Sequence, residues 1–167
     1  MVRSTISILC LVTFVATGCS TIGAKTPKTQ LQIREFQTRT YATNDAKLVM
    51  KALFNVLQDD GFIVKNISTD LGLLSATKEV HVESDREASA ALPDLGRNAK
   101  WKKNSAIDAT VNVSEFGNTC KVRVSFQVKL LSKSGKIKNV QPVDDPNYYQ
   151  KFFSMVDKGI FLQAEKL

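Results

Sequence analysis

The clearest pattern in the chain is a strict alternation of apolar and polar residues over residues 107–114 and 120–130. A period of two is typical of β-strands that bury one face and expose the other. Gly117 and Asn118 lie between the two stretches and predict a turn, so we expect an antiparallel hairpin. Cys120 falls on the apolar side, and we therefore expect it to be buried.

Residues 48–57 follow a different spacing, in which apolar residues recur at intervals of one and four. This spacing gives a helix one broad apolar stripe. Asn44 is the predicted N-cap, and Gly61 is the residue expected to end the helix.

A second long helix is predicted after Pro146, with Asp144 or Asp145 as its cap. Residues 148–162 give this helix more apolar side chains than one face needs. Gly159 inside it costs about 1 kcal/mol relative to alanine. That cost favours close packing against another element, or a bend.

The remaining segments complete an α+β fold. Residues 83–104 form a long connection, where function often lies. Because two helices must bury apolar stripes and the sheet offers one apolar face, we expect a two-layer sandwich: a mainly antiparallel sheet with both main helices packed on one face, as in helix-grip folds. A single domain is expected over residues 31–167. The other predicted elements are strands at 31–41, 62–67, 73–82 and 136–140, and a short helix at 84–92.

The N-terminus has the three-part form of a secretory signal peptide. Arg3 precedes an uncharged, mostly apolar run at residues 5–17, and small residues lead to Cys19. Residues 15–19, Val-Ala-Thr-Gly-Cys, resemble the lipobox of bacterial lipoproteins. The resemblance implies cleavage after residue 18 and acylation of Cys19; the alternative is a cleaved signal followed by an incidental cysteine.

Residues 19–30 have no periodicity and are predicted to be a lipidated, flexible tether. Ser20, rather than aspartate, follows the cysteine, which by resemblance to enterobacterial sorting favours the outer membrane, facing the periplasm. Two or more acyl chains would hold the protein stably at the membrane. After loss of Cys10 with the signal and lipidation of Cys19, Cys120 would remain alone, so no intramolecular disulfide is expected.

The net charge is +7, and removal of the signal with its single Arg3 lowers it by one to +6. This surplus favours anionic surfaces such as phospholipid or lipopolysaccharide, or acidic partners; solubility alone is the simpler explanation. Nucleic acid is not an expected partner in the periplasm.

Several stretches resemble a group of small, uncharacterised lipoproteins of Gram-negative outer membranes. They are residues 36–41 (FQTRTY), 49–62 (VMKALFNVLQDDGF), 71–79 (LGLLSATKE) and 148–153 (YYQKFF). A more distant likeness is to the helix-grip domains of BamC, a lipoprotein of the barrel-assembly machinery. These likenesses imply a compartment and a fold, and they transfer no catalytic residue.

The chain offers little catalytic chemistry. His81 is the only histidine and has no companion at zinc-ligand spacing, so no metal or other cofactor is expected. Cys120 with His81 as base would be the one nucleophile pair, but a thiol among core valines is inert. We therefore expect a protein that is not an enzyme.

Two surfaces are candidates for binding. Lys100, Trp101, Lys102 and Lys103, with Arg97, could hold a tryptophan ring at headgroup level and lysines on phosphates. The alternative is that Trp101 packs on the core while the lysines are solvated. The outward row of Lys121, Arg123 and Lys129 is similarly ambiguous.

The crowded final helix is the other candidate. If one of its apolar faces stays exposed, Tyr149 and Phe153 belong to a docking surface; if not, they belong to the core. The main functional hypothesis is a lipid-anchored, non-enzymatic protein that docks onto another cell-envelope protein. The alternative is a module that binds anionic lipid or lipopolysaccharide through the basic loop.

Overall fold

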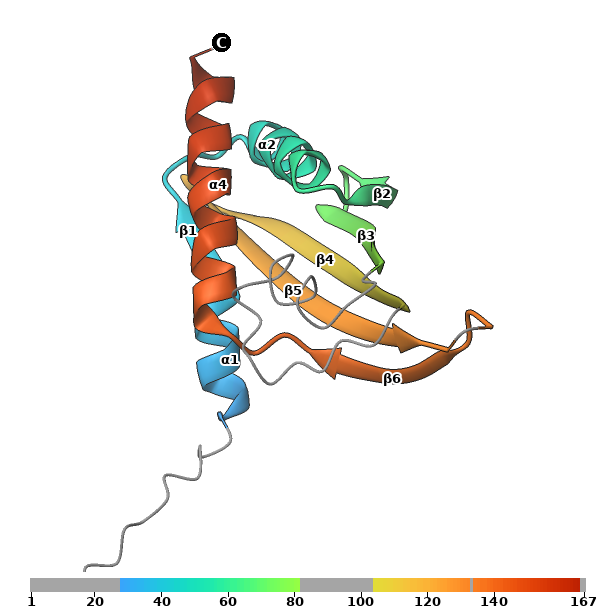
Figure 1. Cartoon of the computed structure of the whole chain (residues 1–167). Coiled ribbons are helices and arrows are strands. Elements are labelled where there is room, and N and C mark those ends of the chain that lie inside the picture. The colour runs from blue at the N-terminus through green and yellow to red at the C-terminus, as the bar shows by residue number, and fades with distance from the viewer. Residues whose placement is uncertain (1–27, 82–103, 133, 166–167) are drawn as a thin grey trace, which may run out of the picture.

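The computed structural model describes residues 28–81, 104–132 and 134–165, and Figure 1 gives the labels of their elements. The helices are α1 (Gln30–Phe36), α2 (Ala46–Asp59) and α4 (Pro146–Ala164). The strands are β1 (Thr38–Tyr41), β2 (Ile63–Ser68), β3 (Leu73–His81), β4 (Asn104–Phe116), β5 (Thr119–Leu131) and β6 (Ile137–Pro142). The predicted short helix at residues 84–92 lies outside the described residues.

All six strands join one antiparallel sheet in the order β1-β5-β4-β3-β2, with β6 also paired to β5. The predicted hairpin is confirmed as β4 and β5, which pair along their full lengths. Strands β1 and β6 share the same side of β5. Along β5, the residues that pair with β1 extend to Arg123, and the residues that pair with β6 start at Gln127.

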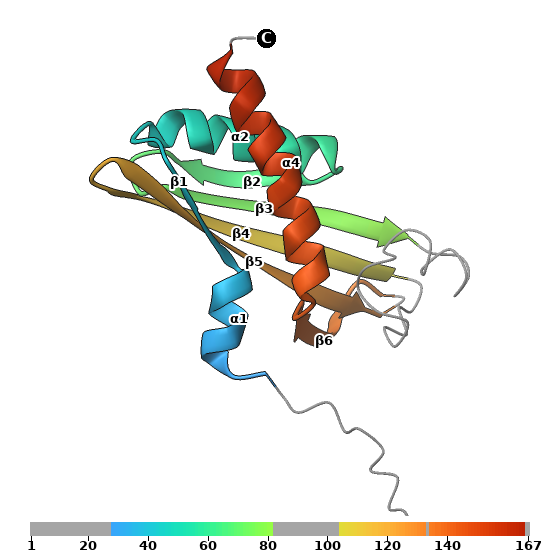
Figure 2. The same ribbon diagram turned by 90° about the vertical axis from the view of Figure 1, so that its left-hand side faces the viewer.

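The expected two-layer α+β arrangement is confirmed. Helices α2 and α4 pack against each other and cover one face of the sheet, and Figure 2 shows both crossing the same side. A Cβ at Gly159 would lie 3.2 Å from Val56 Cγ2, so the glycine permits close approach of the two helices. Cys120 is fully buried on the inner face, as expected. The described core side chains form one cluster between residues 36 and 160.

The prediction of one strand over residues 31–41 is wrong in its first half. Thr29 accepts a hydrogen bond from the Gln32 N–H, and the Gln32 side chain accepts one from the Thr29 N–H. This reciprocal capping box starts helix α1, and only Thr38–Tyr41 is extended. The imperfect alternation of that stretch came from a helix followed by a strand.

The helix caps are partly as predicted. Asp45, one residue after the predicted Asn44, caps α2 by accepting from the Leu48 N–H at 2.9 Å. Gly61 follows the end of α2 with φ 81°, as its expected role requires. Asp145 caps α4, with Pro146 in the first turn.

Candidate functional site

The structure places Tyr149 and Phe153 in the core, with exposed fractions of 0% and 2%. They therefore cannot form the docking surface that the crowded helix suggested. The reason is that α4 covers the sheet with one side chain row while it packs against α2 with another. Cys19, Arg97 and the cluster Lys100, Trp101, Lys102 and Lys103 lie outside the described residues.

Tyr149 instead closes a gap in the sheet. Its hydroxyl accepts hydrogen bonds from the Phe126 N–H at 3.1 Å and from Gln37 Nε2 at 3.2 Å, and donates to the Val143 carbonyl at 3.1 Å. These partners lie beside the part of β5 between Arg123 and Gln127, which pairs with neither β1 nor β6. Burial raises the pKa of Tyr149, although the two hydrogen bonds that its hydroxyl accepts from Phe126 and Gln37 oppose that shift. No local pattern in the chain indicates this role, because it depends on three distant segments meeting.

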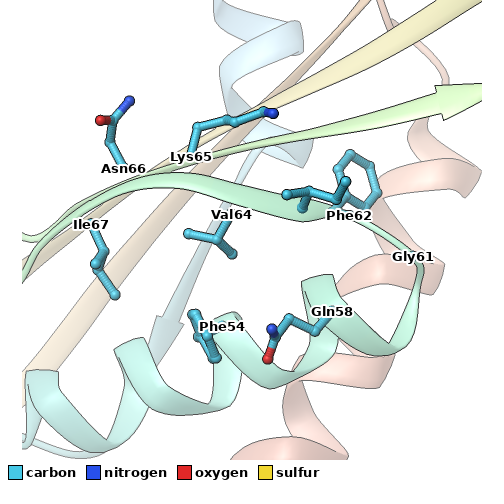
Figure 3. A pocket seen from close by; sticks show the side chains of 9 residues that line it. Phe54, Gln58, Gly61, Phe62, Val64, Lys65, Asn66 and Ile67 are labelled. Carbon is cyan, nitrogen blue, oxygen red and sulfur yellow. The ribbon is translucent and has the colours of Figure 1, made fainter.

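A groove between α2 and the edge strand β2 is the first candidate binding site. We call it the edge groove; its volume is about 600 Å³. In Figure 3, Phe54 of α2 points toward Val64 and Ile67 of β2, which line the same side of the strand. Ile67 is 49% exposed and Phe54 is half-buried, so an apolar part of the groove is open, while Gln58, Lys65 and Asn66 supply polar groups to the rest of its lining.

Strand β2 forms the end of the sheet, and among the described residues it pairs with β3 alone. Its outer backbone edge is therefore unpaired in the described structure. A register shift between Val64 and Asn66 leaves Lys65 as a bulge. Lys65 and Asn66 lie on the strand away from Phe54 (Figure 3), and Asn66 donates to the Ser75 hydroxyl at 3.2 Å.

A second groove, of about 580 Å³, lies on the opposite, polar face of the sheet. We call it the basic groove. Arg34 on α1 and Lys121 and Arg123 on β5 supply its positive charge, and Glu35 is its carboxylate. Two exposed apolar side chains also line it, Leu31 at 79% and Phe116 at 61% exposed.

The C-terminal part of α4 extends past α2 in both views of the ribbon (Figures 1 and 2). Phe161 and Leu162 are 62% and 47% exposed there. Their hollow is lined by four residues of this one helix, Asp157, Lys158, Phe161 and Leu162. A surface built from fewer than two turns of one helix, at about 3.6 residues per turn, offers little shape complementarity with which to select a partner.

The geometry separates the Cys120 and His81 pair. Along the ladder, His81 pairs with Asn104 and Cys120 pairs with Glu115. These positions lie eleven residues apart on β4, or about 36 Å at 3.3 Å per residue. Burial also raises the pKa of the Cys120 thiol, which disfavours the reactive thiolate.

In the part of the chain that the structure describes, no three His, Cys, Asp or Glu side chains are grouped as a metal site would need. Nor does any helix there combine the length and apolar character required to cross a membrane.

Comparison with known proteins adds little to this geometry. No family model matches the sequence, and no curated protein matches it significantly. Among solved structures, the chain is similar to a DUF4468 family protein from Bacteroides ovatus, with a TM-score of 0.41 and 9% identity over 80% of this chain and 89% of that one.

Proposed function

We propose that this chain is a lipid-anchored docking protein that binds an extended segment of another cell-envelope protein along β2. In this proposal Cys19 carries the lipid in the outer membrane, and the folded part faces the periplasm. The protein acts by binding and performs no reaction. The observation that carries the proposal is the edge of β2, which no described strand pairs with on its outer side, beside a groove that exposes apolar side chains.

The chemistry of the edge favours an extended partner. A strand at the end of a sheet presents N–H and C=O groups that another strand can pair with. Alternate side chains of the added strand would point to the same side as Val64 and Ile67. There they would meet Phe54, and the edge groove would supply the pocket that gives specificity.

A second copy of this chain fits the edge less well than a different protein. Two copies of β2 related by a twofold axis would pair antiparallel around the middle of the strand. Lys65 lies there, so the two lysines would approach each other, and like charges in such positions are destabilising. We therefore expect a partner segment with alternating apolar residues and an acidic residue near Lys65.

The tether would strengthen this weak kind of contact. Because Thr29 caps α1, the tether is residues 20–28, and these nine residues reach about 30 Å when extended. Confinement within such a distance of the membrane raises the effective concentration toward the millimolar range for partners in the same membrane.

A photo-crosslinking amino acid at Ile67 tests the site in intact envelopes, with the same amino acid at Thr110, exposed on the polar face, as the control. We expect one protein to be crosslinked from Ile67 and not from Thr110. Its yield should fall in a Cys19→Ala chain. Mass spectrometry should map the crosslink to an extended segment of that protein. Equal yields from both positions, or lipid alone from Ile67, would refute the proposal.

A charge substitution tests the partner chemistry. Lys65→Glu should weaken binding to the mapped segment about tenfold, and an acid-to-lysine change in that segment should restore it. Lys138→Glu, an exposed lysine on the other edge strand β6, makes the same charge change and should have little effect. Equal losses for both variants would leave only a general charge effect and contradict docking at β2.

A further inference from the structure

We propose that the basic groove binds the phosphate groups of anionic phospholipids, so that the polar face of the sheet lies against the membrane. The site is distinct from the edge groove. The inference uses the proposed lipid anchor for its location only, and its chemistry rests on the residues of α1, β4 and β5.

Two cations lie side by side in this groove. Lys121 and Arg123 are two residues apart on β5 and share its outer face, which places them about 6.6 Å apart. Arg34 on α1 adds a third positive charge. Unless an anion lies between them, such neighbours repel each other.

Lys129, the next cation along the same face of β5, is neutralised by an acidic partner, whereas Arg34, Lys121 and Arg123 are not, in the part of the chain that the structure describes. Lys129 forms an ion pair with Asp108, which also accepts a hydrogen bond from the Thr77 hydroxyl at 2.9 Å. Within the described residues, Arg34, Lys121 and Arg123 make no ion pair. The groove therefore holds positive charge that the described protein does not use.

The neighbouring side chains suit a phosphate. Across the sheet, Arg123 pairs with Thr38 and Asn112, and Lys121 pairs with Thr40 and Ser114. Directly opposite residues on one face have Cβ atoms about 5 Å apart. Hydroxyl and amide groups therefore flank both cations. The Ser114 hydroxyl already donates to Asn112 Oδ1 at 2.9 Å, and the Asn112 amide and the threonine hydroxyls can donate hydrogen bonds to phosphate oxygens without adding negative charge.

The apolar residues favour a lipid over an acidic protein segment. Leu31 and Phe116, the two largely exposed apolar side chains of the groove, come from α1 and from the end of β4. Apolar side chains beside cations are typical of surfaces that lie in a membrane interface. The apolar side chains enter the headgroup layer, and the cations bind phosphate.

The position of the groove agrees with this orientation. Thr29, the cap of α1, follows Cys19 by ten residues, a span of at most about 35 Å. Helix α1 lies at one end of the molecule, and the C-terminal end of α4 lies at the other (Figures 1 and 2). Strand β2 is at the far edge of the sheet from β1, so a membrane at the basic groove would leave β2 free.

Vesicle sedimentation tests the site with the chain beginning at Ser20, which lacks the lipid. This chain retains the whole described core cluster, so its fold does not depend on the anchor. We expect it to bind vesicles that contain phosphatidylglycerol far better than vesicles of phosphatidylcholine, and to release on added salt. Failure here would leave the docking test at β2 unaffected.

Lys121→Glu with Arg123→Glu should lower binding at least 30-fold, since each basic residue near an anionic surface contributes about fivefold. Lys136→Glu with Lys138→Glu, at and near the start of β6, makes the same charge change and should lower it far less. Equal losses in the two variants, or a loss confined to Lys100→Glu with Lys102→Glu, would overturn the assignment.

A further pair separates lipid from free phosphate. Leu31→Ser with Phe116→Ser should weaken vesicle binding about tenfold while leaving its salt dependence unchanged. Inorganic phosphate at about 10 mM, which is dilute enough to screen charges only weakly, should not displace the protein from the vesicles. Displacement by phosphate, together with no effect of the apolar pair, would indicate a small-anion site and contradict the membrane orientation.

Discussion

The outer side of β5, where β1 and β6 leave a gap, and the outer side of the edge strand β2 differ in how their backbone groups are covered. On the outer side of β5, the Val124 N–H donates to the Gln37 carbonyl and the Val143 N–H donates to the Phe126 carbonyl, each at 2.9 Å. The Tyr149 hydroxyl fills the remaining place. At β2, no described segment covers the outer side.

The difference follows from how accessible each backbone edge is to water. The gap beside β5 lies over the core, where an unpaired N–H would be costly, and a side chain from α4 satisfies it. The edge of β2 lies at the rim, where water can satisfy the same groups. A partner strand can therefore occupy the edge of β2 without displacing any part of the described fold.

The largest predicted effect concerns the turn that carries the open edge. Gly72 has φ 62°, and a Cβ there would lie 2.0 Å from the Val113 carbonyl oxygen. Gly72→Ala should lower the free energy of unfolding by about 3–4 kcal/mol, because the turn must move and lose the Val113 N–H bond to the Gly72 carbonyl. Urea titration measures this loss.

Gly117→Ala is the matched control for that substitution. Gly117 also has positive φ, at 59°, but a Cβ added there would meet no atom within 4 Å. Backbone strain alone should cost about 1 kcal/mol. Equal losses at the two glycines would contradict the crowding at Gly72.

Breaking the closed edge should have the next largest effect. Tyr149→Phe leaves the Phe126 N–H, the Gln37 amide and the Val143 carbonyl without their shared partner. We expect a loss of about 2–3 kcal/mol in the free energy of unfolding, with faster amide exchange at Phe126. A loss under about 0.5 kcal/mol, the lower end for one hydrogen bond, would mean that the gap does not need the hydroxyl.

Much of the fold could be predicted from the sequence, because its patterns are local. Alternation located β4 and β5, the one-and-four spacing located α2, and the Asp145–Pro146 pair located the start of α4. The strand predicted at residues 31–41 failed because Thr29 and Gln32 form a capping box, a signal that was present but outweighed by the Thr and aromatic content.

The candidate sites could not be predicted in the same way. The role of Tyr149 depends on β1 and β6 sharing one side of β5, which no local pattern encodes. The edge groove depends on which strand lies last in the sheet. The basic groove was visible in part, as the outward row of Lys121 and Arg123, but Arg34 joined it only because residues 30–36 are helical.

Alkaline pH should weaken the closed edge gradually. Burial raises the pKa of Tyr149 above that of an unfolded tyrosine, about 10, and raises that of Cys120 as well. The folded state then keeps protons that the unfolded state has lost. Stability should be constant below about pH 8, fall first through Cys120 and then, above about pH 9, through Tyr149 as well, by up to about 1.4 kcal/mol per pH unit for each group. Tyr149→Phe should reduce the slope above about pH 10, as urea titrations across this range would measure; an unchanged slope would contradict the role of this group.

The smallest effect is expected at the other tyrosine near this edge. Tyr41 on β1 has a buried hydroxyl with no hydrogen-bond partner among the described residues. Tyr41→Phe removes a polar group that gains nothing from its surroundings, so the free energy of unfolding should stay within about 0.5 kcal/mol or rise. Urea titration beside Tyr149→Phe compares this hydroxyl on β1 with the hydroxyl that α4 places against the sheet. A loss above about 1 kcal/mol, the usual worth of a hydrogen bond, would show that Tyr41 does have a stabilising partner, such as the nearby Asp157 carboxylate. Stability on this side of the sheet would then depend on the hydroxyls of both tyrosines rather than on that of Tyr149 alone.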